Sequence, residues 1–176
     1  EKEETETPEE SEMQESPEPV WKTPVITENS YDDGLISITI TEYREYDTAI
    51  YAAEVKLASA EYLRTALAKN SYGRNVTQRT STMAANNNAI LAVNGDYYGA
   101  REKGYVLRNG VLYRETAAKD QEDLVIYPDG SFEIITESEV SAAELYEKGA
   151  QQGLAFGPAL VTDGEISVTE WDEVGQ

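Results

Sequence analysis

The alternation of apolar and polar residues predicts short β-strands along much of the chain. Residues 35–41 alternate β-branched apolar side chains with hydroxyl side chains, a pattern typical of a half-buried strand. Residues 48–57 have the composition of a partner strand. The polar segment 43–47 lies between the two, so the pattern indicates an antiparallel hairpin.

Turn sequences divide the second half of the chain into further short strands. Asn109-Gly110 lies between two apolar runs and predicts a hairpin over residues 104–113. Pro128-Asp129-Gly130 does the same for residues 124–135, and another strand is predicted at 166–168.

Three segments have the spacing or the end signals of helices. Residues 60–68 are short but rich in helix formers, and residues 80–87 open with hydroxyl side chains at 80–82 that can cap a helix. Residues 141–149 open with a capping box. The apolar run 89–93 is predicted to be a buried strand that follows the second helix. The fold class predicted from these elements is α+β, mixed, with mainly antiparallel short strands and two or three helices.

Charge divides the chain into a tail and a domain. The net charge is −20, of which residues 1–20 carry −8 on a segment of Glu, Thr, Ser and Pro with few apolar residues. Such a segment cannot bury enough apolar surface to offset its ordering entropy, so it is predicted to be a disordered acidic tail or linker. Residues 21–176 are long enough for one domain with a hydrophobic core.

Composition excludes several functions for this chain. It holds no His and no Cys, so it cannot build a Ser-His-Asp or Cys-His nucleophile, a disulfide framework or the commonest zinc sites. Its acidity argues against nucleic acid as a partner, and no apolar run is long enough for membrane insertion. The chain begins with Glu1, which we interpret as the trace of a removed export signal and hence of an extracellular or cell-surface location.

The most informative polar segment follows the predicted strand 89–93. Asn94 and Asp96 offer an amide and a carboxylate, and Gly95 between them permits close approach of a ligand. Tyr97 and Tyr98 can stack on a sugar. The same residues also make an ordinary turn, and the segment alone does not decide between the two.

Arginine is concentrated in the middle of the chain. Six of the seven Arg lie between residues 64 and 114. Arg74, Arg79 and Arg101 flank the polar segment and are candidates for holding a phosphate, because a guanidinium binds phosphate through paired N–H donors. The alternative is that these arginines are surface residues that neutralise nearby carboxylates.

A third motif comes later, where Gly157-Pro158 fixes a bend that is either a simple strand entry or part of a site. The strand with its polar segment, the hairpin at 104–110 and this later motif, in this order, resemble the phosphodiester glycosidase family, whose vertebrate relative removes N-acetylglucosamine from a phosphodiester on lysosomal enzymes. The strand and Asn-Gly-Asp-Tyr-Tyr resemble its Asn-Gly-Gly-Phe-Phe-like motif, with Asp96 in place of the commoner Gly. The resemblance covers about residues 35–170.

The resemblance implies a hydrolase that releases an N-acetylglucosamine-like sugar from a sugar-1-phosphodiester, in cell-surface or exopolysaccharide metabolism. It implies catalytic roles for Asp96 and Asn94. The resemblance and the placement of the arginines together give the candidates for substrate binding, which are Gly95, Tyr97, Tyr98, Arg74, Arg79, Arg101, Gly157 and Pro158. No cofactor is certain, and a divalent cation stays open.

Members of the family continue with an Arg-Thr-Ala strand and a Leu-Asp-Gly-Gly-Gly-Ser-like segment that this sequence does not contain. We therefore expect an incomplete domain whose site is completed by a complementary C-terminal segment. Two other classes stay open. The Tyr-rich strands suit a non-catalytic carbohydrate or cell-wall binding module, and the motifs could also be the turns of a structural fragment.

Overall fold

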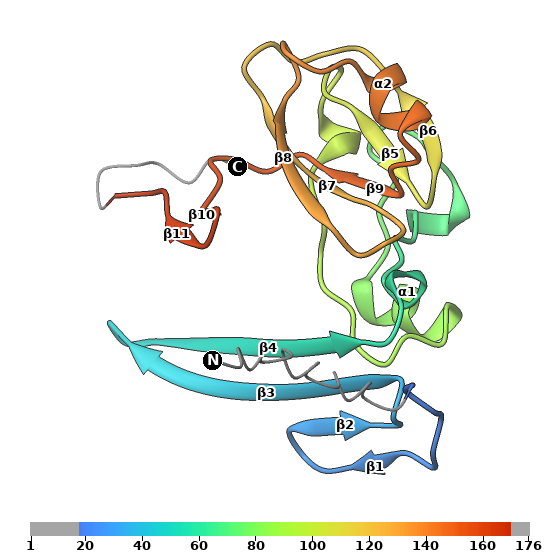
Figure 1. Ribbon diagram of the computed structural model, residues 1–176, viewed down its shortest axis with the longest axis vertical. Coiled ribbons are helices and arrows are strands. Elements are labelled where there is room, and N and C mark those ends of the chain that lie inside the picture. The colour runs from blue at the N-terminus through green and yellow to red at the C-terminus, as the bar shows by residue number, and fades with distance from the viewer. Residues whose placement is uncertain (1–17, 170–176) are drawn as a thin grey trace, which may run out of the picture. The chain divides into compact units, whose positions relative to one another are not determined.

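The computed structural model describes residues 18–169 (Figure 1). Its contacts divide the chain into two compact units, Glu1–Ala58 and Ser59–Gln176. The predicted acidic tail lies mostly outside the described residues. Two α-helices and mainly antiparallel strands are found in the described part, which confirms the predicted balance of elements.

The first unit is a four-stranded antiparallel sheet in the order β1-β2-β3-β4. Its strands are β1 (Val25–Ile26), β2 (Ser30–Asp32), β3 (Ile36–Glu45) and β4 (Thr48–Leu57). The predicted hairpin is confirmed, and it is longer than the pattern indicated. β3 and β4 pair along their full lengths, and only Tyr46 and Asp47 remain for the turn. Both have positive φ, +48° and +59°, as a two-residue hairpin turn requires.

Asp33 fixes the turn between β2 and β3. Its carboxylate accepts hydrogen bonds from the backbone N–H groups of Leu35 and Ile36, at 2.9 and 2.7 Å, and from the Tyr31 hydroxyl at 2.9 Å. Gly34 follows with φ +85°, and a Cβ there would lie 2.3 Å from the backbone oxygen of Val20. The turn therefore depends on glycine at this position.

The second unit contains a five-stranded antiparallel sheet in the order β6-β5-β9-β7-β8. Its strands are β5 (Val106–Arg108), β6 (Val111–Arg114), β7 (Glu122–Ile126), β8 (Phe132–Thr136) and β9 (Gln152–Leu154). Both predicted hairpins, β5–β6 and β7–β8, are confirmed. β9 comes last of the five along the chain but lies between β5 and β7, so it joins the two hairpins into one sheet.

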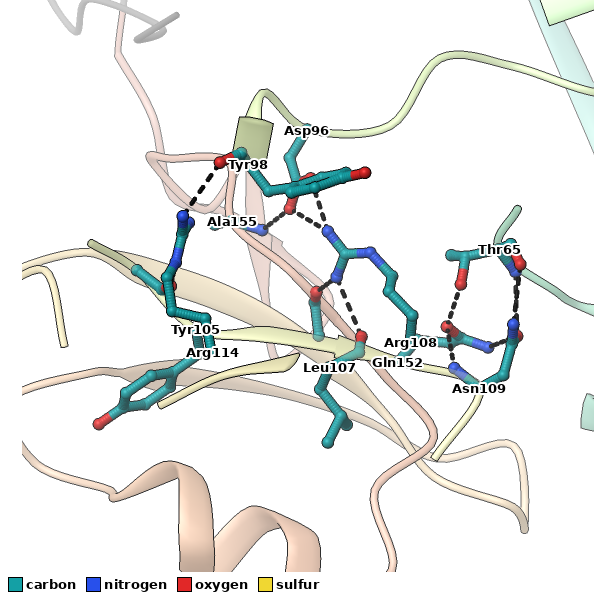
Figure 2. A network of polar contacts seen from close by, with 12 residues as sticks. Thr65, Asp96, Tyr98, Tyr105, Leu107, Arg108, Asn109, Arg114, Gln152 and Ala155 are labelled. Atoms are coloured by element: carbon teal, nitrogen blue, oxygen red, sulfur yellow. Dashed lines mark hydrogen bonds and ion pairs between the residues drawn. The ribbon is translucent and has the colours of Figure 1, made fainter. Parts of the chain in front are cut away.

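One face of this sheet is covered by α2 (Ala142–Glu147), which begins with the predicted capping box of Ser141 and Glu144. The core here consists of Tyr105, Leu107, Val125, Ile135, Ala142, Leu145 and Ala150. Leu107 and Arg108 are consecutive residues of β5 and leave the strand on opposite sides, as Figure 2 shows. Arg108 therefore extends from the face opposite the core.

The remaining elements of the second unit are short. They are α1 (Thr80–Asn86), the 3₁₀ turns η1 (Ala60–Tyr62), η2 (Ala68–Asn70) and η3 (Tyr98–Ala100), and a small hairpin of β10 (Val161–Thr162) and β11 (Glu165–Ile166). Helix α1 is confirmed. Its N-cap is Arg79, whose side chain makes no capping bond, while the Thr80 hydroxyl donates to Asn94 Oδ1.

Two predicted elements are wrong. Residues 60–68 form no α-helix. Their backbone is extended at Leu63 and Leu67, between η1 and η2. Residues 89–93 form no strand and are exposed, with Val93 87% accessible. An apolar run becomes a buried strand only when a neighbour pairs with it, and no strand of the described residues pairs with this one.

Candidate functional site

An ion pair shielded from water lies at the centre of the candidate site. Arg108 Nη2 donates to both carboxylate oxygens of Asp96, at 2.6 and 2.8 Å. The Arg108 side chain is 5% exposed and the Asp96 side chain 2%. Figure 2 shows Asp96 reaching the guanidinium from above the sheet. Asp96 was predicted as a site residue, and its partner Arg108 was not.

The sheet backbone holds the guanidinium in place. Arg108 Nη1 donates to the carbonyl of Leu107 at 3.0 Å and to that of Gly153. Gly153 is the middle residue of β9, directly opposite Leu107 of β5. Two carbonyls of adjacent strands thus hold one guanidinium nitrogen, while Asp96 holds the other.

A backbone amide completes the surroundings of Asp96. The N–H of Ala155, just after β9, donates to Asp96 Oδ2 at 2.8 Å. Three N–H···O bonds therefore converge on one carboxylate. This oxyanion arrangement is built from one charged guanidinium nitrogen and a backbone donor.

Aromatic rings extend outward from the ion pair. The Tyr98 ring lies 5.6 Å from the Arg108 guanidinium carbon, within cation–π distance. Tyr98 stacks on Tyr72 with 5.6 Å between ring centroids, and Tyr72 stacks on Tyr113 at 4.9 Å. Burial raises the pKa of the Tyr98 hydroxyl. Tyr98 is thus held between a cation and a second ring.

Tyr97 lies in a different environment from its neighbour. Its ring is exposed and meets Phe156 edge to face, with centroids 6.1 Å apart. Gly157 and Pro158 follow Phe156, joined by a cis peptide bond. Phe156 and Pro158 line a hollow of about 240 Å³ with residues of β7, β8 and the segment after Pro158. The structure therefore brings the predicted residues Tyr97, Gly157 and Pro158 into one neighbourhood.

The other predicted residues are distributed around the centre. Asn94 Oδ1 accepts the bond from Thr80 of α1, and Gly95 has nothing within 4 Å of an added Cβ. Arg101 Nη1 donates to Gln121 Oε1 at 2.8 Å. Arg74 forms an exposed ion pair with Glu102 at 2.7 Å. None of these bonds reaches the carboxylate of Asp96.

Arg79 is exposed and precedes α1. Arg114 has a structural task, because it donates to the carbonyls of Gly104, Tyr98 and Arg101 at 2.6, 3.1 and 2.7 Å. It thereby fixes η3 and the chain that follows Tyr98. Of the seven arginines, it is Arg108 that the structure brings to Asp96.

A second polar network anchors the segment before α1 to the sheet (Figure 2). The buried Gln152 of β9 accepts from the Asn109 N–H at 3.0 Å and from the Thr65 hydroxyl at 2.9 Å. Asn109 in turn accepts from the Thr65 N–H and donates to its carbonyl, at 3.1 and 2.8 Å. Asn109 therefore does more than form the β5–β6 turn.

A buried carboxyl pair lies inside the second unit. Asp123 is 1% exposed, and neither of its carboxylate oxygens has a donor among the described residues. Burial, together with the Glu137 carboxyl beside it, raises the pKa of Asp123 to about 8. Glu137 accepts from the N–H groups of Tyr105, at 2.6 Å, and Ala118. With its pKa raised to about 8, Asp123 holds a proton at neutral pH.

Two further sequence expectations concern metals and membranes. Within residues 18–169, no group of three or more acidic side chains gathers as ligands for a metal ion. Within the same range, no helix has the length and apolar character needed to cross a bilayer.

Comparison with known proteins identifies a family that matches the part of the chain containing the site. The model of the family described as phosphodiester glycosidase matches residues 87–175. The SPbeta prophage-derived uncharacterized protein YomE of Bacillus subtilis (strain 168) is 29% identical over 113 residues. That alignment covers 58% of this chain and 17% of the relative. No solved structure matches significantly.

Proposed function

Because this chain belongs to the phosphodiester glycosidase family, we propose that it takes part in hydrolysis that releases a sugar from a sugar-1-phosphodiester. One observation carries the proposal. Asp96, Arg108 and Ala155, which form the oxyanion arrangement, all lie within the residues that the family model matches. A phosphodiester is an anion, and a guanidinium with a backbone amide suits it.

The proposed chemistry uses the carboxylate of Asp96 as the acid or base of the cleavage, or as acceptor for a sugar hydroxyl. Acid–base catalysis requires a group within hydrogen-bond reach of the proton that moves. The chain contains no His, so a carboxyl group, a Tyr hydroxyl, a Lys or a group from another chain takes this part. Asn94, two residues earlier and exposed, would contribute an amide to the sugar.

We propose that the sugar lies on Tyr97, beside Phe156 and the bend at Gly157-Pro158. Tyr97 and Phe156 are exposed aromatic rings in contact, which supports stacking on an apolar sugar face. The aromatic rings fit a pyranose such as N-acetylglucosamine. We place this activity outside the cell or at the cell surface. The proposal leaves open whether a divalent cation is required.

A complementary segment would complete the site. Ile90, Leu91 and Val93 are exposed apolar side chains next to Asn94, without a pairing strand in the described residues. An added strand would bury them and bring further polar groups to Asp96. This exposure supports the expectation that residues outside this chain contribute to catalysis.

The test is release of the free sugar from an N-acetylglucosamine-1-phosphodiester, with and without a supplied family C-terminal segment. We expect turnover with the segment, and a loss of at least about a hundredfold for Asp96→Ala, as for removal of an acid–base group. Asp163→Asn is the matched control, because Asp163 lies in the exposed β10–β11 turn. Unchanged turnover in Asp96→Ala would remove Asp96 from the chemistry.

A non-catalytic carbohydrate-binding module is the alternative. The observation that favours it is that Asp96 and Arg108 bond to each other, while Tyr97 and Phe156 are exposed. Binding of N-acetylglucosamine oligomers without turnover, even with the C-terminal segment present, would support this alternative over hydrolysis.

A further inference from the structure

The carboxylate of Asp96 occupies a place where a phosphate would fit. It receives two bonds from Arg108 Nη2 and one from the Ala155 N–H, at 2.6 to 2.8 Å. A phosphate oxygen accepts from a guanidinium and a backbone amide in the same way. The donors are therefore arranged for an oxyanion, and a side chain of the protein fills the position.

The donors are also held by contacts other than those to Asp96. The other guanidinium nitrogen of Arg108 is bound to the carbonyls of Leu107 and Gly153, and Tyr98 lies against the guanidinium. Ala155 directly follows the end of β9, whose pairing with β7 fixes the backbone. An anion that replaced Asp96 would meet donors that are already oriented.

The segment that carries Asp96 is held much less firmly. Within the described chain, residues 90–96 make no backbone–backbone hydrogen bond and belong to no helix or strand. Val93, Asn94 and Gly95 are exposed, and Gly95 has open space around it. The carboxylate of Asp96 is thus a main attachment of this segment to the sheet, and Asn94 adds a bond to Thr80 of α1.

We propose that Arg108 and the Ala155 amide are the phosphate-binding site for the substrate phosphodiester, and that Asp96 occupies this site until the phosphate displaces it. The ligand class rests on the function proposed above. A buried guanidinium is costly without a counter-anion, so one anion must replace the other. Displacement also frees the Asp96 carboxylate next to the bound substrate, where it can act on the sugar.

This assignment differs from the arginines predicted on sequence. Arg74 is paired with Glu102 on the surface, and Arg101 is bound to Gln121. A surface guanidinium attracts phosphate weakly, because water screens its charge. Arg108 combines burial, a fixed orientation and a second donor.

The test measures anion binding, without turnover, on the full chain. The probes are dimethyl phosphate, as a minimal phosphodiester, and inorganic phosphate, followed through the NMR signal of the Ala155 amide. Asp96→Asn removes the competing charge and keeps the side-chain size. We expect it to bind dimethyl phosphate about tenfold or more tightly than the wild type, as removal of a buried like charge predicts.

The double variant Asp96→Asn with Arg108→Gln is expected to lose this binding. Asp163→Asn changes the net charge equally and should bind as the wild type does. If Asp96→Asn does not fold, the proposed phosphate site is tested on the wild type. Dimethyl phosphate at high concentration must then give a saturable shift of the NMR signal of the Ala155 amide.

Equal affinity in the wild type and Asp96→Asn would overturn the displacement. Binding that survives in the double variant would place the anion elsewhere, and no shift of Ala155 in any folded variant would overturn the site. A preference for inorganic phosphate over dimethyl phosphate would overturn the phosphodiester as ligand. If the anion binds at Arg108 but no sugar is released, the proposed function is rejected and this inference stands. If sugar is released but no anion binds at Arg108, this inference is rejected and the proposed function stands.

Discussion

Arg108 and Asp96 stabilise the second unit as a pair, since both side chains are almost fully shielded from water. Desolvating both charges costs free energy, which their two short bonds and the backbone contacts offset. Losing one member leaves the other as an unpaired buried charge. The pair is therefore a point where stability and the proposed binding depend on the same atoms.

Arg108→Gln should lower the free energy of unfolding by about 3–5 kcal/mol, the range for breaking a buried pair from one side. Urea unfolding followed by circular dichroism measures the loss. Arg44→Gln is the control, because Arg44 pairs with Asp47 on the exposed end of the β3–β4 hairpin. It should cost within about 0.5 kcal/mol. An equal loss of unfolding free energy in the two variants would show that burial of the Arg108 ion pair does not increase its contribution to stability.

Asp123 predicts a specific dependence of stability on pH. Its pKa is raised to about 8 in the folded chain, from about 3.9 when unfolded. The folded state therefore binds the extra proton between these values, and the stability that Asp123 contributes is complete below about pH 4 and lost as pH rises to about 8.

Asp123→Asn removes this titration while keeping the shape of the side chain. The difference in unfolding free energy between the wild type and Asp123→Asn should change by about 1 kcal/mol per pH unit between pH 5 and 8, with the wild type losing stability as pH rises. Denaturant titrations at several pH values give this difference. A difference that stays constant would show that Asp123 is ionised in the folded chain.

At the scale of elements, local signals predicted the hairpins well. Asn109-Gly110 adopts φ +50° and +74°, which these residue types accept more readily than others do. The order β6-β5-β9-β7-β8 could not be predicted in this way, because β9 pairs with strands distant in sequence. Arg108 was missed for the same reason. Its hairpin was recognised, but its burial depends on Gly153 and Asp96 from other segments.

For the run 89–93, the sequence predicted a buried strand that the structure does not contain. Its apolar residues satisfy every local rule for a buried strand, yet burial is a property of the partner that covers them. We expect Val93→Thr to change the unfolding free energy by within about 0.5 kcal/mol, since Val93 is 87% exposed. Leu107→Ala, in the core of the same unit, should cost about 2–5 kcal/mol.

Thermal and urea unfolding of the two variants measures this contrast in the isolated chain. The contrast should shrink when a complementary segment is added, because a paired strand would bury Val93. A large loss of unfolding free energy in Val93→Thr in the chain alone would contradict the exposure of Val93. If an added segment restores turnover but leaves the effect of Val93→Thr unchanged, strand pairing at 89–93 would be contradicted.

At the scale of the whole molecule, the candidate site belongs to one of the two units. The polar and aromatic contacts described for it come from residues between Thr65 and Pro158, within the second unit. Residues 1–58 carry −12 of the net charge of −20. A long-range negative field disfavours the approach of an anion, and salt screens this effect.

A chain of residues 59–176 should therefore keep the Ala155 amide signal and its response to dimethyl phosphate. At low salt it should bind this probe more tightly than the full chain does, because it lacks the charge of residues 1–58, and the difference should disappear near 1 M salt, where the Debye length is about 3 Å. NMR titrations of both chains at the two salt concentrations measure this. The full chain with residues 1–20 removed is the control, and it should recover part of the gain. Loss of the Ala155 response in a folded 59–176 chain would show that the first unit contributes to the site.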